Sequence, residues 1–499
     1  MKVLKVVLPA MMCFVFSVQS QPFYYVDEDT KASISAKPVD KDCDFASGEF
    51  GDYFYTSPVL RLSPKIKMYD KQTMEMVWAV EMEKKWEYKG KKLSLDTAIF
   101  LNDGSTLVIS WYNNKKREQI ELFGKRLDVN GKELETKPLA EFKARSFTDI
   151  KVTPIISDST LVLLAISGQD KKEASTIQCA WLNNNLDPIQ QQAINLNDPS
   201  KIDNYSYDSK RKTLYVATTY RTVSKIAVRI KSQRVVSFNI NDLKPKVKLL
   251  DFEEATASVN YVWVDESTGT PYLFGMAGPK KTQQLSTLFA IALSPSDLSV
   301  QKTKFFQISG KAVKDLMDSK KGIDNFYDGS NAAFFKLQNV LRNSDRVYVI
   351  FENVNSFGNR YGQFVVEFDK NFNEANQHYL GNYGLFNSEA NIDNQGQLHV
   401  YFMAELKHLQ ERVPDLEGTK QELESGKSIN KNSGLIEAII SGDDVTYKTL
   451  FVVDREMELF SYLISHCKRL ANETELYITA SKGYYNRDKT YIRVVTTMK

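Results

Sequence analysis

Cysteine and histidine are scarce in this 499-residue chain, which contains four of each. The spacing of the cysteines matches no zinc-binding pattern, and the histidines stand alone, without an HExxH motif. Cys179 and Cys467 lie in apolar, strand-like runs, where a cysteine usually packs as a small buried hydrophobic side chain. The sequence therefore predicts no metal site and a fold that depends on its hydrophobic core.

Motifs for recognised chemistries are also absent. There is no GxSxG nucleophile motif, no phosphate-binding glycine loop and no dinucleotide-binding glycine pattern. The nearest approach to a calcium loop, Gly442-Asp443-Asp444, lacks alternating oxygen donors and is typical of a hairpin turn. We therefore expect no cofactor, and the sequence assigns no catalytic residue.

An apolar run long enough to span a membrane is missing as well. The run from Val6 to Val18 has about 13 residues against the roughly 20 that a spanning helix needs, and Pro9 interrupts it. Lysines precede this run, and small and polar residues follow it, which is the three-part pattern of a secretory signal peptide. We predict that residues 1–21 form a signal peptide and that the mature protein is extracytoplasmic: periplasmic, on the cell surface or secreted.

Cys13 raises the alternative of a lipid anchor, because bacterial lipoproteins are cut directly before a lipidated cysteine. A lipobox needs a small residue at the position before that cysteine, and here Met12 occupies it. We therefore expect no lipid anchor.

Neither sign of charge dominates the chain. Removal of the signal peptide takes away two lysines and lowers the formal net charge from +3 to +1. A protein that binds nucleic acid through its phosphates needs a concentrated basic surface. The near-neutral mature chain therefore argues against nucleic acid as the partner.

The sequence does contain a weak repeat. Seven segments place turn-forming residues before a short β-forming run, which is typical of the second strand of a hairpin. Most intervals between successive runs lie near ~50 residues, the period of a four-stranded propeller blade. The runs are 106–110, 161–165, 213–218, 271–274, 347–351, 398–402 and 476–479.

This period predicts an all-β protein, a seven-bladed β-propeller of four-stranded antiparallel blades. Two longer intervals contain insertions, 310–331 and 406–434, which we expect to be partly helical. Strand-like segments at 65–69 and 76–82 have no unit of their own, and the last unit ends with only 490–497. We therefore expect N- and C-terminal strands to close the propeller within one blade, which leaves no open sheet edge.

The assignment makes residues 60–499 a single propeller domain and residues 22–59 an N-terminal extension. The extension could be a tether, or it could wrap the blade that closes the propeller. A pair of β-sandwiches is the alternative architecture, and it would not explain complementary deficits at the two chain ends.

Aromatic and basic residues recur in the predicted loops between second and third strands, which share the top face of a propeller. Exposed rings beside cationic side chains suit stacking on sugars or binding of a protein partner, although packing at strand ends would explain some of them. The candidate ligand-binding residues are Trp111, Tyr112, Tyr220, Arg221, Tyr327, Arg360, Tyr361, Tyr484, Tyr485 and Arg487.

Four carboxylates, Asp149, Asp203, Asp328 and Asp454, fall on predicted blade-to-blade loops at the same face. Propeller glycosidases use carboxylates from different blades that meet only in space. Aspartate is also favoured in turns for local reasons, so these residues do not by themselves indicate catalysis.

The blade-length repeat, the signal peptide and turns such as Phe368-Asp369-Lys370-Asn371 resemble secreted β-propeller proteins of Bacteroidota type. The resemblance covers the architecture of residues 60–499 and implies no activity. The kelch double glycine, the WD dipeptide and the Asp-box of better-defined propellers are absent.

Together these features favour an exported, non-catalytic binding or scaffold module for a protein or glycan partner in the cell envelope or outside the cell. One alternative is a carbohydrate-active hydrolase or lyase that uses Asp and Glu residues at the central channel. The other is a subunit of an envelope assembly, which would carry a large apolar patch on its blade sides. No oligomeric state is predicted.

Overall fold

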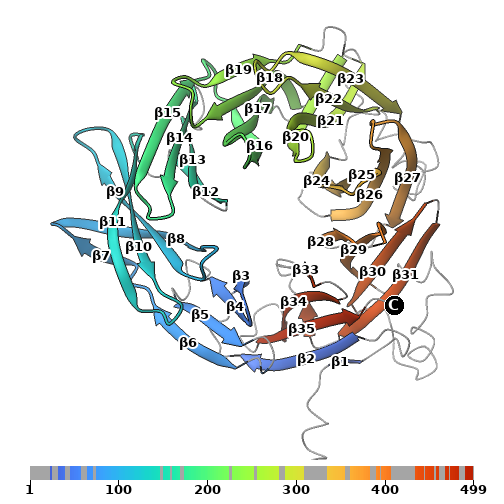
Figure 1. Ribbon diagram of the computed structural model, residues 1–499, viewed down its shortest axis with the longest axis horizontal. Helices are drawn as coiled ribbons and strands as arrows, with labels where there is room; N and C mark the ends of the chain where they lie inside the picture. Colours follow the sequence, from blue (N-terminus) through green and yellow to red (C-terminus); the bar gives the residue numbers. More distant parts are fainter. Residues whose placement is uncertain are drawn as a thin grey trace, which may run out of the picture. The chain divides into compact units, whose positions relative to one another are not determined.

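The computed structural model is all-β (Figure 1). The expected signal peptide and both expected insertions lie outside the described residues, except that Ser433 and Gly434 already belong to a strand. The model describes residues 23–24, 32–39, 45–57, 65–70, 73, 75–146, 150–157, 160–168, 174–223, 228–251, 255–279, 287–307, 334–354, 360–381, 389–393, 395–405, 433–442, 444–453, 457–459, 467–470, 473–482 and 489–497.

The chain forms two compact units. The larger comprises residues 47–70 and 76–379, and the smaller comprises residues 1–46, 71–75 and 380–499. The described strand pairs are antiparallel and divide the strands into eight sheets, most of them four-stranded. None of the described residues belongs to a helix that could span a membrane.

The larger unit contains six sheets, β3–β6, β7–β11, β12–β15, β16–β19, β20–β23 and β24–β27, each hydrogen-bonded in chain order. The strands are β3 (Phe45–Phe50), β4 (Tyr53–Ser57), β5 (Lys65–Asp70), β6 (Met76–Glu81), β7 (Lys85–Tyr88), β8 (Lys91–Phe100), β9 (Thr106–Asn114), β10 (Gln119–Leu127), β11 (Glu133–Lys143), β12 (Ile150–Ile156), β13 (Thr160–Ser167), β14 (Thr176–Asn183), β15 (Pro188–Asn195), β16 (Lys201–Asp208), β17 (Thr213–Val223), β18 (Val228–Asn239), β19 (Lys246–Leu249), β20 (Ala255–Asp265), β21 (Thr270–Pro279), β22 (Thr287–Leu293), β23 (Val300–Gln307), β24 (Phe334–Arg342), β25 (Arg346–Val354), β26 (Arg360–Asp369) and β27 (Glu374–Gly381).

The smaller unit contains two sheets. In the first, β28 to β31 are hydrogen-bonded in chain order and β1 adds to β31; in the second, β35 lies between β2 and β34, which pairs with β32 and β33. The strands are β1 (Phe23–Tyr24), β2 (Ala32–Val39), β28 (Glu389–Ile392), β29 (Leu398–Glu405), β30 (Ser433–Ser441), β31 (Asp444–Val453), β32 (Met457–Leu459), β33 (Cys467–Leu470), β34 (Glu473–Lys482) and β35 (Lys489–Thr497).

The all-β class is confirmed. Each predicted run lies in a different antiparallel sheet, in β9, β13, β17, β21, β25, β29 and β34 respectively. These seven sheets, mostly of four strands, are consistent with a seven-bladed propeller.

The pairing at the N-terminus differs from the expectation. Residues 65–69 and 76–82 do not join the C-terminal strands; β5 and β6 form a further sheet with β3 and β4, which the seven units did not include. The N-terminal strand that pairs with the C-terminal strand is β2, along the full length of Ala32–Val39. The boundary expected at residue 60 therefore cuts through a sheet, and part of the expected extension is blade structure.

Neighbouring sheets of the larger unit pack face to face, because alternate side chains of one strand point to opposite faces of its sheet. All eight residues of β13 are buried. Leu161 and Leu163 pack with side chains of β9, β10 and β11, whereas Val162 and Leu164 pack with side chains of β17 and β18. Successive side chains of a strand point to opposite faces of its sheet, so a continuous apolar run serves two interfaces at once.

In several sheets the strand directly before the predicted run carries a bulge. In β8, β16, β20 and β24 the pairing with the next strand skips one residue, which is Asp96, Asp203, Asn260 and Gln338 respectively. Of these strands, β16, β20 and β24 lie on the inner side of the larger unit in Figure 1, and the last strands of the same sheets, β19, β23 and β27, lie on its outer side. A bulge redirects the side chain of the extra residue. In each of these four sheets, the redirected side chain is polar.

Candidate functional site

The structure places six of the ten predicted ligand-binding residues in strands. Trp111 and Tyr112 belong to β9, Tyr220 and Arg221 to β17, and Arg360 and Tyr361 begin β26. The expected loop position is wrong for these six, because the ladders continue further than the turn residues suggested. The other four, Tyr327, Tyr484, Tyr485 and Arg487, lie outside the described residues.

Trp111 and Tyr112 point to different environments although they are adjacent. Trp111 packs against the cluster formed by β9–β11, β13 and β14, so the packing interpretation holds for this residue. Tyr112 is half-buried, and the Lys91 Nζ lies 5.4 Å from the centre of its ring. Tyr112 therefore belongs to a surface that was not predicted from the sequence.

This surface is built on the hairpin of β7 and β8. Its two-residue turn, Lys89-Gly90, has φ values of 48° and 75°, as a type I′ turn requires, and glycine adopts such values without strain. Trp86 donates from its indole nitrogen to the Ser110 hydroxyl over 3.0 Å, and Tyr88 donates to the Thr136 carbonyl over 2.9 Å. These two bonds fix β7 to β9 and β11 of its own sheet.

Lysine side chains lie over the aromatic rings of this hairpin and its sheet. Lys125 Nζ is 4.4 Å from the centre of the Trp86 ring, and Trp86 and Tyr88 meet edge to face. Lys91 Nζ lies between Tyr112 and Phe123, at 5.4 and 5.3 Å. An ammonium group over an aromatic face is an attractive cation–π contact. We call the group of Trp86, Tyr88, Lys91, Tyr112 and Lys125 the aromatic–lysine surface.

Glu121 anchors the centre of this surface. It accepts hydrogen bonds from the Lys91 ammonium and, over 2.9 Å, from the Asn114 amide. Burial raises the pKa of Glu121, but the bonds from Lys91 and Asn114 and the nearby positive charges outweigh burial and lower it. The carboxylate therefore stays ionised and holds Lys91 in place.

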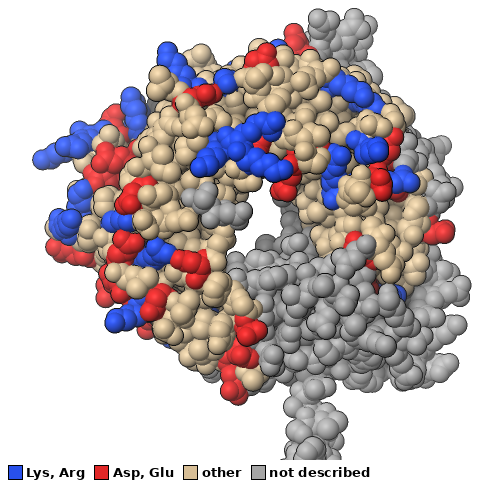
Figure 2. Space-filling model, viewed as in Figure 1, with Lys and Arg blue, Asp and Glu red and all other residues tan. Residues whose placement is uncertain are grey.

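Unpaired cations surround the aromatic–lysine surface. Four exposed lysines of the hairpin and three exposed cations of the β9–β10 turn form no ion pair with any residue that the structure describes. The two turns lie at the same end of the sheet, because Ser94 pairs with Trp111 and because Glu121 bonds to both Lys91 and Asn114. Figure 2 shows Lys and Arg side chains projecting from this sheet at the left of the view. The seven cations are Lys84, Lys85, Lys89, Lys92, Lys115, Lys116 and Arg117.

Both described histidines, His378 and His399, are buried beside carboxylates. The shorter contact is that of His399. Its Nδ1 lies 2.7 Å from Glu437 Oε1, the same oxygen to which the Tyr401 hydroxyl donates over 2.9 Å, and all three side chains are buried. His378 is buried beside Glu367 at 3.4 Å. Within the described part of the chain, no group of three or more His, Cys, Asp or Glu residues could hold a metal ion.

Cys179 is a buried, free cysteine, as expected from its apolar run. Burial raises the pKa of its thiol well above the ordinary value. A thiol with so high a pKa forms little of the thiolate that reacts, so Cys179 serves the core. The other strand cysteine, Cys467, begins β33.

Sequence analysis missed one carboxylate with an unusual environment. Asp96, the bulge residue of β8, has no hydrogen-bond or ion-pair partner among the described residues, and burial raises its pKa to about 6. Asp203, the bulge residue of β16, accepts a hydrogen bond from the Thr219 hydroxyl. Asp149, Asp328 and Asp454 lie outside the described residues.

No protein-family model and no curated protein matches this sequence. An apocarotenoid oxygenase variant of Synechocystis is 10% identical with a TM-score of 0.35, over 86% of this chain and 94% of that one. A post-proline cleaving enzyme from Rickettsia typhi is 11% identical with a TM-score of 0.36, over 89% of this chain and 58% of that one. A puromycin hydrolase is 9% identical with a TM-score of 0.37, over 76% and 53%.

The likeness of these structures to the chain is distant, and no sequence family is identified. With every one of these TM-scores below 0.5, the fold assignment rests on the strand pairing, and no activity extends from these proteins to this chain.

Proposed function

We propose that this protein is an exported, non-catalytic binding module whose ligand is an anionic glycan, bound at the aromatic–lysine surface of β7–β11. The observation that carries the proposal is the coincidence of half-buried aromatic rings with seven unpaired cations at one end of one sheet. Aromatic faces stack on sugar rings, and ammonium groups pair with their carboxylate or sulfate substituents.

The contacts around Trp86 and Tyr88 support this function. Both rings are held by hydrogen bonds through their polar atoms and by lysines over their faces, so a ligand would meet them already oriented. Preorganised side chains lose less conformational entropy on binding than free ones. The exposed lysines add long-range attraction for a polyanion and need no fixed geometry.

The test is binding of the mature protein to polysaccharides by isothermal titration calorimetry at two salt concentrations. The panel contains a polyuronate, a sulfated polysaccharide and neutral dextran, with an acidic protein as the macromolecular comparison. We expect the polyuronate or the sulfated chain to bind, more weakly at higher salt, and dextran not to bind.

A triple variant, Lys85→Gln, Lys89→Gln and Lys92→Gln, should lower the affinity about tenfold or more if each ammonium contributes roughly 0.5–1 kcal/mol. The matched control changes Lys201, Lys244 and Lys302 to glutamine, because these are exposed lysines of other sheets and the net charge falls equally. Equal losses in both variants, or tight binding of the acidic protein alone, would contradict the anionic-glycan proposal.

A carbohydrate-active hydrolase is the second candidate, and Asp96 is the observation in its favour. A carboxyl group with a pKa of about 6 can remain protonated near neutral pH, as a general acid must. Asp203 occupies the equivalent bulge of another sheet. Release of reducing ends from a polysaccharide by the native protein, abolished in Asp96→Asn, would establish the hydrolase; activity that persists in this variant would exclude Asp96 as the acid.

The envelope-assembly alternative has less support. The large exposed apolar side chains of the described outer strands are distributed over several sheets, among them Leu134 of β11, Ile189 of β15 and Phe305 of β23. Apolar residues scattered in this way are normal on a protein surface and do not define an interface.

A further inference from the structure

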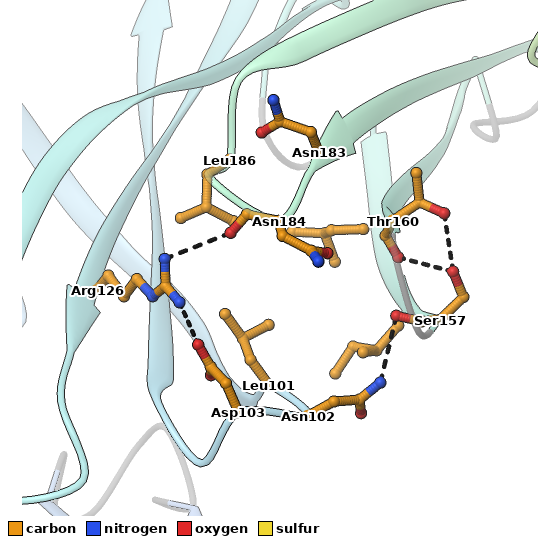
Figure 3. Close-up of a pocket in the computed structure, with 11 residues that line it drawn as sticks. Leu101, Asn102, Asp103, Arg126, Ser157, Thr160, Asn183, Asn184 and Leu186 are labelled. Atoms are coloured by element: carbon orange, nitrogen blue, oxygen red, sulfur yellow. Dashed lines mark hydrogen bonds and ion pairs between the residues drawn. The ribbon is translucent and has the colours of Figure 1, made fainter.

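A pocket of about 250 Å³ opens between the sheets β7–β11 and β12–β15, at the end opposite to the β9–β10 turn (Figure 3). Its wall comes from the β8–β9, β12–β13 and β14–β15 turns and from Arg126 of β10. It is smaller than the pockets that hold drug-sized ligands, which begin at roughly 300 Å³, so it suits a single ring. We call it the inter-sheet pocket.

Two hydrogen bonds between the sheets fix the width of this pocket. The Arg126 guanidinium donates to the Asn184 carbonyl over 3.3 Å, and the Asn102 amide donates to the Ser157 carbonyl over 3.3 Å. Both bonds join the two sheets, one on each side of the space in Figure 3. The pocket is therefore built into the sheet packing and does not depend on a ligand to form.

The charges at the pocket cancel. Among the described residues that line it, Asp103 and Arg126 are the only ionisable ones; they form an ion pair with each other, and Arg126 also lies 3.8 Å from Glu135. Burial raises the pKa of Asp103, but hydrogen bonds from Ser105 and the charge of Arg126 outweigh burial and lower it, so the carboxylate stays ionised. Among the described lining residues, a ligand with a net charge would find no free counter-ion.

The remaining lining is neutral and of two kinds. Leu101 and Ile156 form the accessible aliphatic surface, because Leu161 and Leu186 are buried, while the polar groups are amides and hydroxyls. The Asn184 side-chain amide has no partner among the described residues and points into the space in Figure 3. An amide offers a donor pair and an acceptor side by side, which matches two neighbouring hydroxyl groups of a ligand.

We propose that the inter-sheet pocket binds a neutral, hydroxyl-rich ring, such as one uncharged pyranose residue. Leu101 and Ile156 contact the C–H face of the ring, and the Asn184 amide hydrogen-bonds to its hydroxyls. This site lies on different residues from the aromatic–lysine surface and takes a ligand of different charge, so neither assignment requires the other.

The experiment is saturation-transfer-difference NMR, followed by titration, of the full mature chain with neutral pyranoses at millimolar concentration. Methyl glycosides of glucose, galactose, mannose and N-acetylglucosamine form the neutral set, and glucuronate and galacturonate are the charged comparison. The variant is Asn184→Ala, whose side chain is exposed and unpartnered, so folding should be unaffected. The matched control is Asn185→Ala, an exposed amide of the same turn that does not line the pocket.

At least one neutral pyranose should bind to the native protein and to Asn185→Ala with equal affinity, and about 5–10-fold more weakly to Asn184→Ala, the effect of one or two lost hydrogen bonds. Absence of binding by all neutral sugars, stronger binding of the uronates, or equal affinity in both variants would overturn the proposal. The Lys85, Lys89 and Lys92 triple variant should leave this binding unchanged, which separates failure here from failure of the proposed function.

Discussion

Two neighbouring sheets, β7–β11 and β12–β15, contain the corresponding strands β9 and β13, which begin alike and end differently. In β9 the first five residues, Thr106–Ser110, are buried, and the last four, from Trp111 to Asn114, are half-buried. In β13 all eight residues are buried. The common part packs each sheet against its neighbours. Its last residue in β9, Ser110, accepts the hydrogen bond from Trp86 of the β7–β8 hairpin, directly before the part of β9 that differs from β13.

The difference between β9 and β13 shows which part of a repeated strand is able to carry ligand-binding residues. The start of each such strand must fill two interfaces, so its sequence is restricted to apolar residues of suitable size. The far end of β9, together with an extra strand that β12–β15 lacks, is free of that restriction. The aromatic residues of the aromatic–lysine surface lie at this extra strand and at the half-buried end of β9, where the sheet differs from its neighbour.

The largest expected effect comes from comparing a substitution in the buried part of a strand with one at an exposed strand position. Leu163→Ala in β13 removes a fully buried side chain from the cluster between the sheets and should cost about 3 kcal/mol of unfolding free energy, because a cavity remains. Leu134→Ala in β11 removes a largely exposed side chain and should cost about 0.5 kcal/mol or less. Denaturant midpoints followed by tryptophan fluorescence measure both.

Similar losses in the two variants would mean that the face-to-face clusters do not dominate stability. A small loss for Leu163→Ala alone would mean that the neighbouring side chains collapse into the space, which the dense packing of β13 should prevent.

A second comparison concerns the bulge residues of β8 and β16. The folded-state pKa of Asp96 is about 6, above its ordinary value of 3.8, so the folded protein binds this proton more tightly than the unfolded chain. Ionised Asp96 therefore destabilises the fold above about pH 6, and this cost disappears as the pH falls toward about 4. Asp96→Asn should stabilise the protein by about 1–3 kcal/mol near pH 7.5 and have little effect near pH 4.

Asp203→Asn is the control, because Asp203 has a hydroxyl donor, Thr219, that Asp96 lacks. It should give no such pH-dependent gain. Thermal unfolding of both variants across this pH range measures the difference, and an equal gain in the two would show that the bulge, and not the missing partner, determines the cost.

The seven second strands could be predicted because each follows a turn signal and carries its own apolar run. β3 and β4 were missed because they are short and lie before the first such run, and Gly51-Asp52, the turn between them, was not recognised. Gly51 has a φ of 55°, as expected for a turn glycine.

The candidate sites were harder to predict because their residues meet only through tertiary structure. Tyr112 was selected as an aromatic residue of a predicted loop, but Trp86 and Tyr88 stand in a lysine-rich segment that is typical of a solvated surface. The inter-sheet pocket draws on three turns and one strand of two sheets, and no spacing along the chain relates Asn102 to Asn184. The bulge at Asp96 breaks the alternation of β8 and so hides the environment of this carboxyl group.

The smallest expected effect concerns the turns between third and fourth strands. Leu186, Leu298 and Phe372 adopt φ values of 62°, 59° and 59°, which side chains other than glycine rarely tolerate, and all three are buried. The recurrence in three sheets indicates that the apolar contact offsets the backbone strain. Replacement of Leu186 by Ala loses the contact and keeps the strain, whereas replacement by Gly loses the contact and relieves the strain.

Leu186→Gly should therefore be about 1 kcal/mol more stable than Leu186→Ala, the reverse of the usual order. At Leu182, which lies in β14 and packs in the same cluster, Gly should be less stable than Ala by about 0.5–1 kcal/mol. Chemical denaturation of the four variants measures both differences. If Gly is less stable than Ala at both positions, Leu186 bears no backbone strain. If the stability order of Gly and Ala is reversed at Leu186 alone, this turn accepts backbone strain in order to place a side chain between the two sheets.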